Sequence, residues 1–273
     1  MPDAPTDLSL ATVCLTGPLE ERLAAAAHAG FDGIELFEPD RAASGLSPAE
    51  VHKHCTDLGL KIVAHQPFHD FEALPLELHA TNMRRLDRAF DLMSELDCDL
   101  LLMCSSESPH TIDDVGLAVE QLHTAAVEAA ARGMRIAYEA LAWGRYVNTW
   151  QQSWEIVRSV DHPALGVCLD SFHIYATGSD ISGIADVPGD KIFLYQIADA
   201  DYLDLPPKQW SRHHRKLPGA GTFDLTALTA AVRGAGYTGP LSLEVFTDDT
   251  GTGPDRAAVE AFRPLAALEP RPS

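Results

Sequence analysis

The chain has 273 residues, of which 46% are hydrophobic, and its 40 acidic and 20 basic side chains give a formal charge of −20. Such a balance opposes binding to the phosphate backbone of nucleic acids and to anionic lipid. No apolar run approaches the ~20 residues of a membrane span, no secretory signal precedes the first strand, and the five cysteines form no Cys-x-x-Cys pair. The sequence therefore predicts a cytoplasmic protein that binds neither nucleic acid nor membrane.

Apolar runs and helical patterns alternate along the chain. The expected strands span residues 8–15, 33–38, 61–68, 99–105, 135–141, 165–169, 192–197 and 241–246. The expected helices span residues 18–29, 47–58, 76–96, 113–131, 149–160, 181–184, 224–235 and 254–268. Strands separated by helices lie parallel, because each crossover returns the chain to the same end of the sheet. Eight such units predict one α/β domain over residues 1–273, a (β/α)8 barrel. A doubly wound sheet is the alternative, without a Gly-x-Gly-x-x-Gly motif to support it.

Four of the later strands each deliver one oxygen-bearing side chain near the end of the strand. These side chains are Glu139, Asp170, Gln196 and Glu244. Because barrel active sites lie at the carboxyl ends of the strands, we expect the four groups to converge. Three carboxylates and a carboxamide suit Mg²⁺, Mn²⁺ or a similar divalent ion, which would relieve their mutual repulsion. Each carboxylate taken alone could equally form a structural ion pair.

Two histidines and one further carboxylate are candidates for roles beside this patch. His173 lies three residues beyond Asp170, where a neutral imidazole could act as general acid or base. His65, at the end of the third strand, is a second candidate for the base. Glu35, on the second strand, could orient a histidine, bind a substrate hydroxyl or belong to a buried ion pair.

The densest basic cluster is Trp210–Lys216, inside a connection over residues 199–222 that we expect to be a long loop covering the barrel mouth. Arginine offers two parallel hydrogen bonds to a carboxylate, so this cluster could hold an anionic substrate in an acidic protein. The alternative is a solvated loop whose charges pair with surface acids.

Several motifs resemble the xylose-isomerase-like barrels of the sugar phosphate isomerase/epimerase superfamily, and most closely the bacterial 3-dehydroshikimate dehydratases. The likeness covers residues 11–246. The motifs are Tyr-Glu-Ala-Leu-Ala-Trp-Gly (138–144), Leu-Asp-Ser-Phe-His (169–173), Gln-Ile-Ala-Asp-Ala (196–200), Trp-Ser-Arg-His (210–213) and Leu-Ser-Leu-Glu-Val-Phe (241–246).

The resemblance implies a lyase that converts 3-dehydroshikimate to protocatechuate with a divalent ion, Mg²⁺, Mn²⁺ or Co²⁺. The ion would bind to the four strand-end groups named above. His173 matches the general base, and Glu139 is expected to share in catalysis. The substrate carboxylate is placed on Ser211 and Arg212. The further expected substrate contacts are Gln66, His69, where the family has arginine, and Glu35.

Two alternatives remain open at this point. A metal-dependent ketose 3-epimerase or inosose dehydratase would use the same metal patch, with two acid/base groups on opposite faces of the substrate, and would not need a carboxylate site at Arg212. A non-catalytic barrel would bind a metabolite without turning it over. The sequence leaves the oligomeric state open, a homo-oligomer included.

Overall fold

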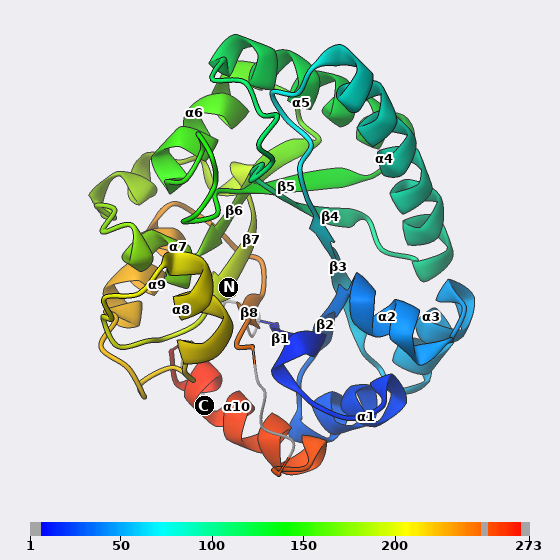
Figure 1. Cartoon of the computed structure of the whole chain (residues 1–273). Coiled ribbons are helices and arrows are strands. Elements are labelled where there is room, and N and C mark those ends of the chain that lie inside the picture. Colours follow the sequence, from blue (N-terminus) through cyan, green and yellow to red (C-terminus); the bar gives the residue numbers. More distant parts are fainter. Residues whose placement is uncertain (1–6, 247–250, 269–273) are drawn as a thin grey trace.

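The computed structural model describes residues 7–246 and 251–268. Within these residues eight parallel strands close into a barrel in sequence order, β1 to β8, as expected (Figure 1). The strands are β1 (Leu8–Ala11), β2 (Gly33–Phe37), β3 (Lys61–Phe68), β4 (Leu100–Cys104), β5 (Arg135–Glu139), β6 (Leu165–Asp170), β7 (Ile192–Ile197) and β8 (Leu241–Leu243). The barrel closes where β1 pairs with β8, Ser9 opposite Ser242.

Helices surround the barrel on the outside (Figure 1). They are α1 (Leu19–Ala29), α2 (Glu38–Ser44), α3 (Pro48–Asp57), α4 (Leu76–Leu96), α5 (Val115–Ala131), α6 (Trp150–Val160), α7 (Ser171–Ala176), α8 (Pro207–His214), α9 (Leu225–Gly234) and α10 (Pro254–Leu268). Short 3-10 helices are η1 (Thr12–Cys14), η2 (Ser182–Asp186) and η3 (Gly189–Lys191).

Local sequence signals explain where several helices begin and end. Ser47 accepts a hydrogen bond from the Glu50 backbone N–H, and the Glu50 side chain accepts one from the Ser47 N–H, so the predicted capping box of α3 is present. Helix α1 ends at Gly30, whose φ of +100° is a left-handed conformation that favours glycine.

The core has an inner and an outer part, which strand β4 illustrates. Leu100, Leu102 and Cys104 belong to the cluster that fills the barrel interior, whereas Leu101 and Met103 pack with the larger cluster toward the helices. A strand buried on both faces has a continuous apolar run, and this run is the signal that predicts β4. All five cysteines are free and buried, as expected of core thiols.

The structure differs from the expected elements mainly at the carboxyl ends of the strands. Strands β1 and β8 are shorter than predicted, because η1 follows β1 directly and the chain leaves the barrel after Leu243. Helices α2, α7 and α8 were not predicted. Each has eight residues or fewer, too short for a clear helical period in the sequence. Helix α8 lies within the connection that we expected to be a loop.

None of the helices in the described ranges is both long and apolar enough to cross a membrane. That residues 1–273 form a single domain stays a prediction, since residues 1–6, 247–250 and 269–273 lie outside the described part.

Candidate active site

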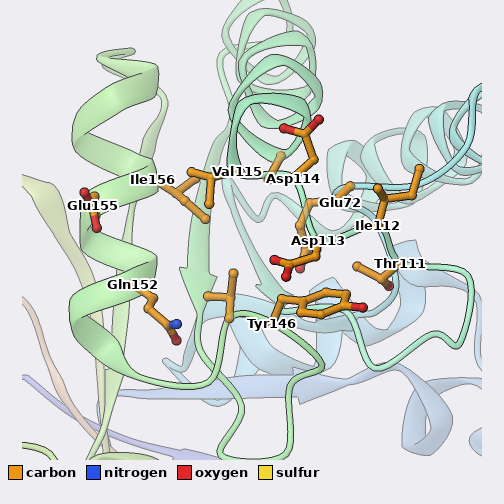
Figure 2. A pocket seen from close by; sticks show the side chains of 13 residues that line it. Glu72, Thr111, Ile112, Asp113, Asp114, Val115, Tyr146, Gln152, Glu155 and Ile156 are labelled. Carbon is orange, nitrogen blue, oxygen red and sulfur yellow. The ribbon is translucent and has the colours of Figure 1, made fainter.

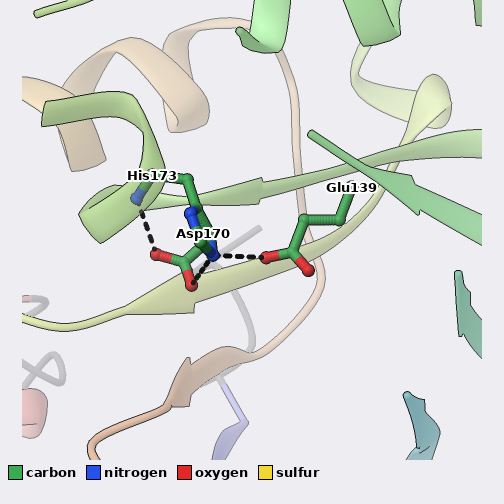
Figure 3. A group of neighbouring side chains, drawn as sticks. All are labelled: Glu139, Asp170 and His173. Atoms are coloured by element: carbon green, nitrogen blue, oxygen red, sulfur yellow. Dashed lines mark hydrogen bonds and ion pairs between the residues drawn. The ribbon is translucent and has the colours of Figure 1, made fainter. Parts of the chain in front are cut away.

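The four predicted strand-end groups are all buried at the carboxyl end of the barrel. Glu139 ends β5, Asp170 ends β6, Gln196 lies on β7 and Glu244 follows β8. Ligand atoms of Glu139, Asp170 and His173 lie within 4.8 Å of one another (Figure 3). The expected convergence is therefore observed, and strand register produces it: Asp170 pairs with Gln196 across β6 and β7.

An arginine lies at the centre of this patch. Arg215 Nη1 donates to Asp170 Oδ2 and to Glu244 Oε2, both at 2.9 Å, and the arginine side chain is only 1% exposed. Its Nε donates to Ser211 Oγ at 3.1 Å. The guanidinium thus neutralises two carboxylates that would otherwise repel each other inside the barrel.

The basic cluster that contains Arg215 was expected to hold the anion through Ser211 and Arg212. Ser211 is fully buried and accepts from Arg215, while Arg212 is half-buried and stacks over the Phe246 ring at 4.1 Å. The signal that could have identified Arg215 is its spacing of four from Ser211, the spacing of neighbours on a helix face, although Arg215 itself directly follows the last residue of α8. It was missed because α8 was expected to be a loop.

Hydrogen bonds fix the state of the His173 ring. The Ala142 backbone N–H donates to Nδ1 at 2.9 Å, which favours a neutral ring with its proton on Nε2, and Arg215 Nη2, itself a donor, lies 3.3 Å from Nε2. Nε2 lies 3.6 Å from Glu139 Oε1 and 3.8 Å from Asp170 Oδ2. Burial and the positive charge of Arg215 lower the pKa of His173 well below its usual range, which keeps the ring neutral.

His65, the second candidate for the base, lies outside this cluster. Its Nε2 is 3.0 Å from Glu38 Oε2, and Glu38 also accepts from Arg41. These bonds lower the pKa of Glu38 to about 2 against the opposing effect of burial. The geometry therefore favours His173 over His65 for a role in proton transfer at the patch.

The remaining charges show why the patch suits a cation. Burial, with Asp170 and Glu244 close by, raises the pKa of Glu139 well above its usual range. Glu139 Oε1 is buried and has no hydrogen-bond partner in the described part of the chain. An unpaired buried oxygen beside further carboxylates is a strong ligand for a divalent ion, so the residues present fit a hard metal.

Glu35 lies beneath the patch and is fully buried. It accepts from Gln196 Nε2 at 2.8 Å and from Gln66 Nε2 at 3.1 Å, and Ser242 Oγ donates to its other oxygen. Burial and the charge of Glu244 raise the pKa of Glu35 to about 8. The carboxylate therefore links strands β2, β3, β7 and β8 rather than reaching the barrel mouth.

A small cavity of about 30 Å³ opens above the patch. Among its lining residues are Gln66, His69, Trp143, Ser211 and Arg212. His69 is half-buried, and burial lowers its pKa. The cavity holds little more than one water molecule, so a ring-sized ligand requires lining side chains to move.

A second cavity, of about 180 Å³, lies between the first turns of α5 and α6 and shares no lining residue with the first (Figure 2). Acidic side chains and apolar side chains such as Ile112, Val115 and Ile156 surround it. None of the predicted site residues lines it, so it does not belong to the patch.

Fold and patch together define a (β/α)8 barrel whose mouth is lined by carboxylates. The chain belongs to the xylose isomerase-like TIM barrel family, whose model matches residues 23–268. A 3-dehydroshikimate dehydratase of Pseudomonas aeruginosa is 50% identical over 96% of this chain, and the chain covers 41% of that protein. One of Neurospora crassa with the same name is 28% identical over 85% of this chain and 83% of its own length.

Among solved structures, a xylose isomerase-like TIM barrel/4-hydroxyphenylpyruvate dioxygenase fusion protein superposes with a TM-score of 0.95 at 47% identity. The match covers 97% of this chain and 43% of the fusion protein. This chain therefore spans about two fifths of the length of its Pseudomonas relative and of the fusion protein.

Proposed function

We propose that this chain is a metal-dependent 3-dehydroshikimate dehydratase that forms protocatechuate. The observation that carries the proposal is the buried patch in which Glu139, Asp170, Gln196 and Glu244 meet His173 and a buried cation, Arg215. The likeness to dehydratases over nearly the whole chain supports the same reaction.

The four strand-end groups would hold the ion, Mg²⁺, Mn²⁺ or Co²⁺, with oxygen ligands. When bound, the ion would polarise the ring ketone of the substrate and stabilise negative charge on its oxygen. The substrate carboxylate would bind to Arg215 and Arg212, because these are the two guanidinium groups that line the cavity. Substrate binding would then draw Arg215 away from Asp170 and Glu244, which frees both carboxylates.

Glu139 is assigned the proton transfers, with His173 as a hydrogen-bond donor. The carbon next to the ketone loses a proton to the Glu139 carboxylate, whose Oε1 has no hydrogen-bond partner among the described residues. Glu139 then returns this proton to the departing β-hydroxyl, which leaves as water, while the neutral His173 donates a hydrogen bond to that oxygen from Nε2–H, the tautomer that the Ala142 amide favours. Tautomerisation of the ring gives the aromatic product. The base expected from the sequence, His173, thus serves in this scheme as a hydrogen-bond donor to the leaving oxygen.

The test uses protein stripped of metal and supplied with 3-dehydroshikimate and Mg²⁺, Mn²⁺ or Co²⁺, while the ultraviolet absorbance of protocatechuate is followed. We expect product only with metal, and none with Glu139→Ala. Absence of product with all three ions would overturn the dehydratase assignment. Turnover of ketoses or inososes by the same protein would then favour the epimerase alternative, and binding without turnover the non-catalytic one.

We also propose that the protein works in the cytoplasm on a small anion. Five free, buried cysteines suit a reducing compartment. The charge of −20 argues against nucleic acid as a partner.

A further inference from the structure

The one neutral group in the proposed metal patch raises a question of orientation. The carboxamide of Gln196 carries an oxygen that can bind a cation and a nitrogen that repels one. Rotating the amide by half a turn exchanges the two atoms with almost no change in shape. Some neighbouring group must therefore decide which atom faces the patch.

Glu35 is the group placed to determine which atom of the Gln196 amide faces the patch. Its Oε2 accepts from Gln196 Nε2 at 2.8 Å, so a rotated amide would bring two oxygens together there. Gln196 Oε1 contacts only a weak donor in the described part of the chain, the Cys168 thiol at 3.5 Å, which leaves lone pairs for a cation. Both Glu35 and Gln196 have no exposed surface, so water cannot replace this contact.

Glu35 holds a second amide in the same way. Gln66 Nε2 donates to Glu35 Oε2 and to Glu244 Oε1, each at 3.1 Å. Ser242 Oγ supplies a donor to the other oxygen of Glu35. Glu35 does not line the cavity at the mouth, so its role is not a direct contact with substrate.

We infer that Glu35 is a positioning residue that holds the Gln196 amide with its oxygen toward the metal. The inference rests on the proposed metal site. The feature that matters is a hydrogen-bond acceptor at position 35, not its charge. In Glu35→Gln the amide oxygen can accept from both glutamines while its nitrogen donates to Ser242 Oγ, so the orientation of Gln196 is retained. In Glu35→Met no acceptor remains.

The experiment is calorimetric titration of metal-stripped protein with Mn²⁺, which needs no turnover. We expect Glu35→Met to weaken Mn²⁺ binding by about 10- to 100-fold, the usual effect of losing an outer-shell partner, and Glu35→Gln to stay within about threefold of the wild type. An equal loss in both variants would show that charge matters instead and would overturn the inference. The matched control is Glu72→Gln, a buried glutamate away from the patch, which should leave binding unchanged.

A second background tests whether the effect acts through Gln196. In Gln196→Glu both terminal atoms of the side chain are oxygens, so there is no amide left to orient. The new carboxylate at position 196 and the carboxylate of Glu35 then repel each other. Replacing Glu35 by Met should therefore change Mn²⁺ binding by the same factor as replacing it by Gln in that background. A larger loss for Glu35→Met than for Glu35→Gln in both backgrounds would contradict the inference.

Thermal unfolding in EDTA checks that each variant folds. If Glu35→Met does not fold, Glu35→Gln still decides, because Mn²⁺ binding within about threefold of the wild type supports the acceptor role and a larger loss contradicts it. Wild-type protein that binds no divalent ion would overturn the metal site and this role together. Binding of Mn²⁺ without formation of protocatechuate would overturn only the proposed reaction.

Discussion

At the scale of single residues, the site is governed by one buried cation among carboxylates. Arg215 bonds Asp170 and Glu244, two of the groups that the sequence predicts to be metal ligands. Two cations in the same place would repel, so Arg215 and a divalent ion compete for these oxygens. This competition leads to a prediction about stability.

Arg215→Leu should lower the thermal unfolding midpoint strongly in EDTA, because removing one partner of a buried ion pair costs about 3–5 kcal/mol. Saturating Mn²⁺ should recover most of the loss, since the ion supplies the missing charge. The control is Arg212→Leu, which removes the stacking on Phe246 and should cost the same with and without Mn²⁺. Equal losses for Arg215→Leu in both conditions would contradict the competition.

A second prediction at this scale concerns pH. Burial raises the pKa of Glu72 to about 7, against the hydrogen bond from the Ser106 N–H. The folded state therefore binds a proton more tightly than the unfolded state, whose pKa is about 4.5. Stability from this group is fully present below pH 4.5 and is lost as the pH rises to about 7, by up to about 3 kcal/mol.

Urea unfolding of the wild type and of Glu72→Gln between pH 5.5 and 8 measures this effect. The variant cannot titrate at this position, so its stability relative to the wild type should rise with pH. A constant difference across this range would show that Glu72 ionises normally in the folded protein.

At the scale of elements, one buried aspartate holds the connection that carries Ser211 and Arg215. Asp199 follows β7 and accepts four backbone hydrogen bonds, at 2.8–3.0 Å. The donors are the N–H groups of Ala200, Gly219, Gly221 and Phe223. It also pairs with Lys216 through two backbone bonds. Both ends of the connection around α8 are thus fixed to the barrel.

Asp199→Asn should loosen this connection, because the new amide group presents a donor to backbone N–H groups that need an acceptor. Leaving such donors unpaired costs about 1–3 kcal/mol, which corresponds to roughly tenfold or more faster proteolytic cleavage within residues 200–222. Limited proteolysis with mass spectrometry measures the rate. The matched control, Asp201→Asn, removes only a half-exposed ion pair with Lys216 and should change the rate little. Similar rates in the two variants would contradict the role of Asp199.

At the scale of the whole molecule, the charge of −20 acts against an anionic substrate. Salt shortens the range of this repulsion from about 30 Å at 10 mM to about 8 Å at 150 mM. With metal saturating, kcat/KM for 3-dehydroshikimate should therefore rise roughly two- to fivefold over this range. Steady-state assays in NaCl and in KCl check this result, and both salts should agree. A fall in kcat/KM with salt would mean that local attraction by Arg212 and Arg215 outweighs the overall field.

The sequence by itself determined the barrel and the four strand-end groups of the patch. Strands such as β4 and β6 are buried on both faces and appear as apolar runs, and Gly30 and the Ser47 capping box mark where helices end and begin. Because all strands are parallel, polar groups at their carboxyl ends must meet, so the order of elements alone places Glu139 and Asp170 together.

Only the tertiary structure decided what each polar group contacts. Arg215 reaches Asp170 and Glu244 across 45 and 29 positions of the sequence, and Glu35 reaches Gln196 across 161. Local sequence patterns do not encode these long-range contacts, because the contacts depend on side-chain direction and strand register in the closed barrel. The short helix α8 shows the same limit, since an eight-residue segment has little helical stability of its own and its buried residues, Trp210 and Ser211, are covered only in the folded chain.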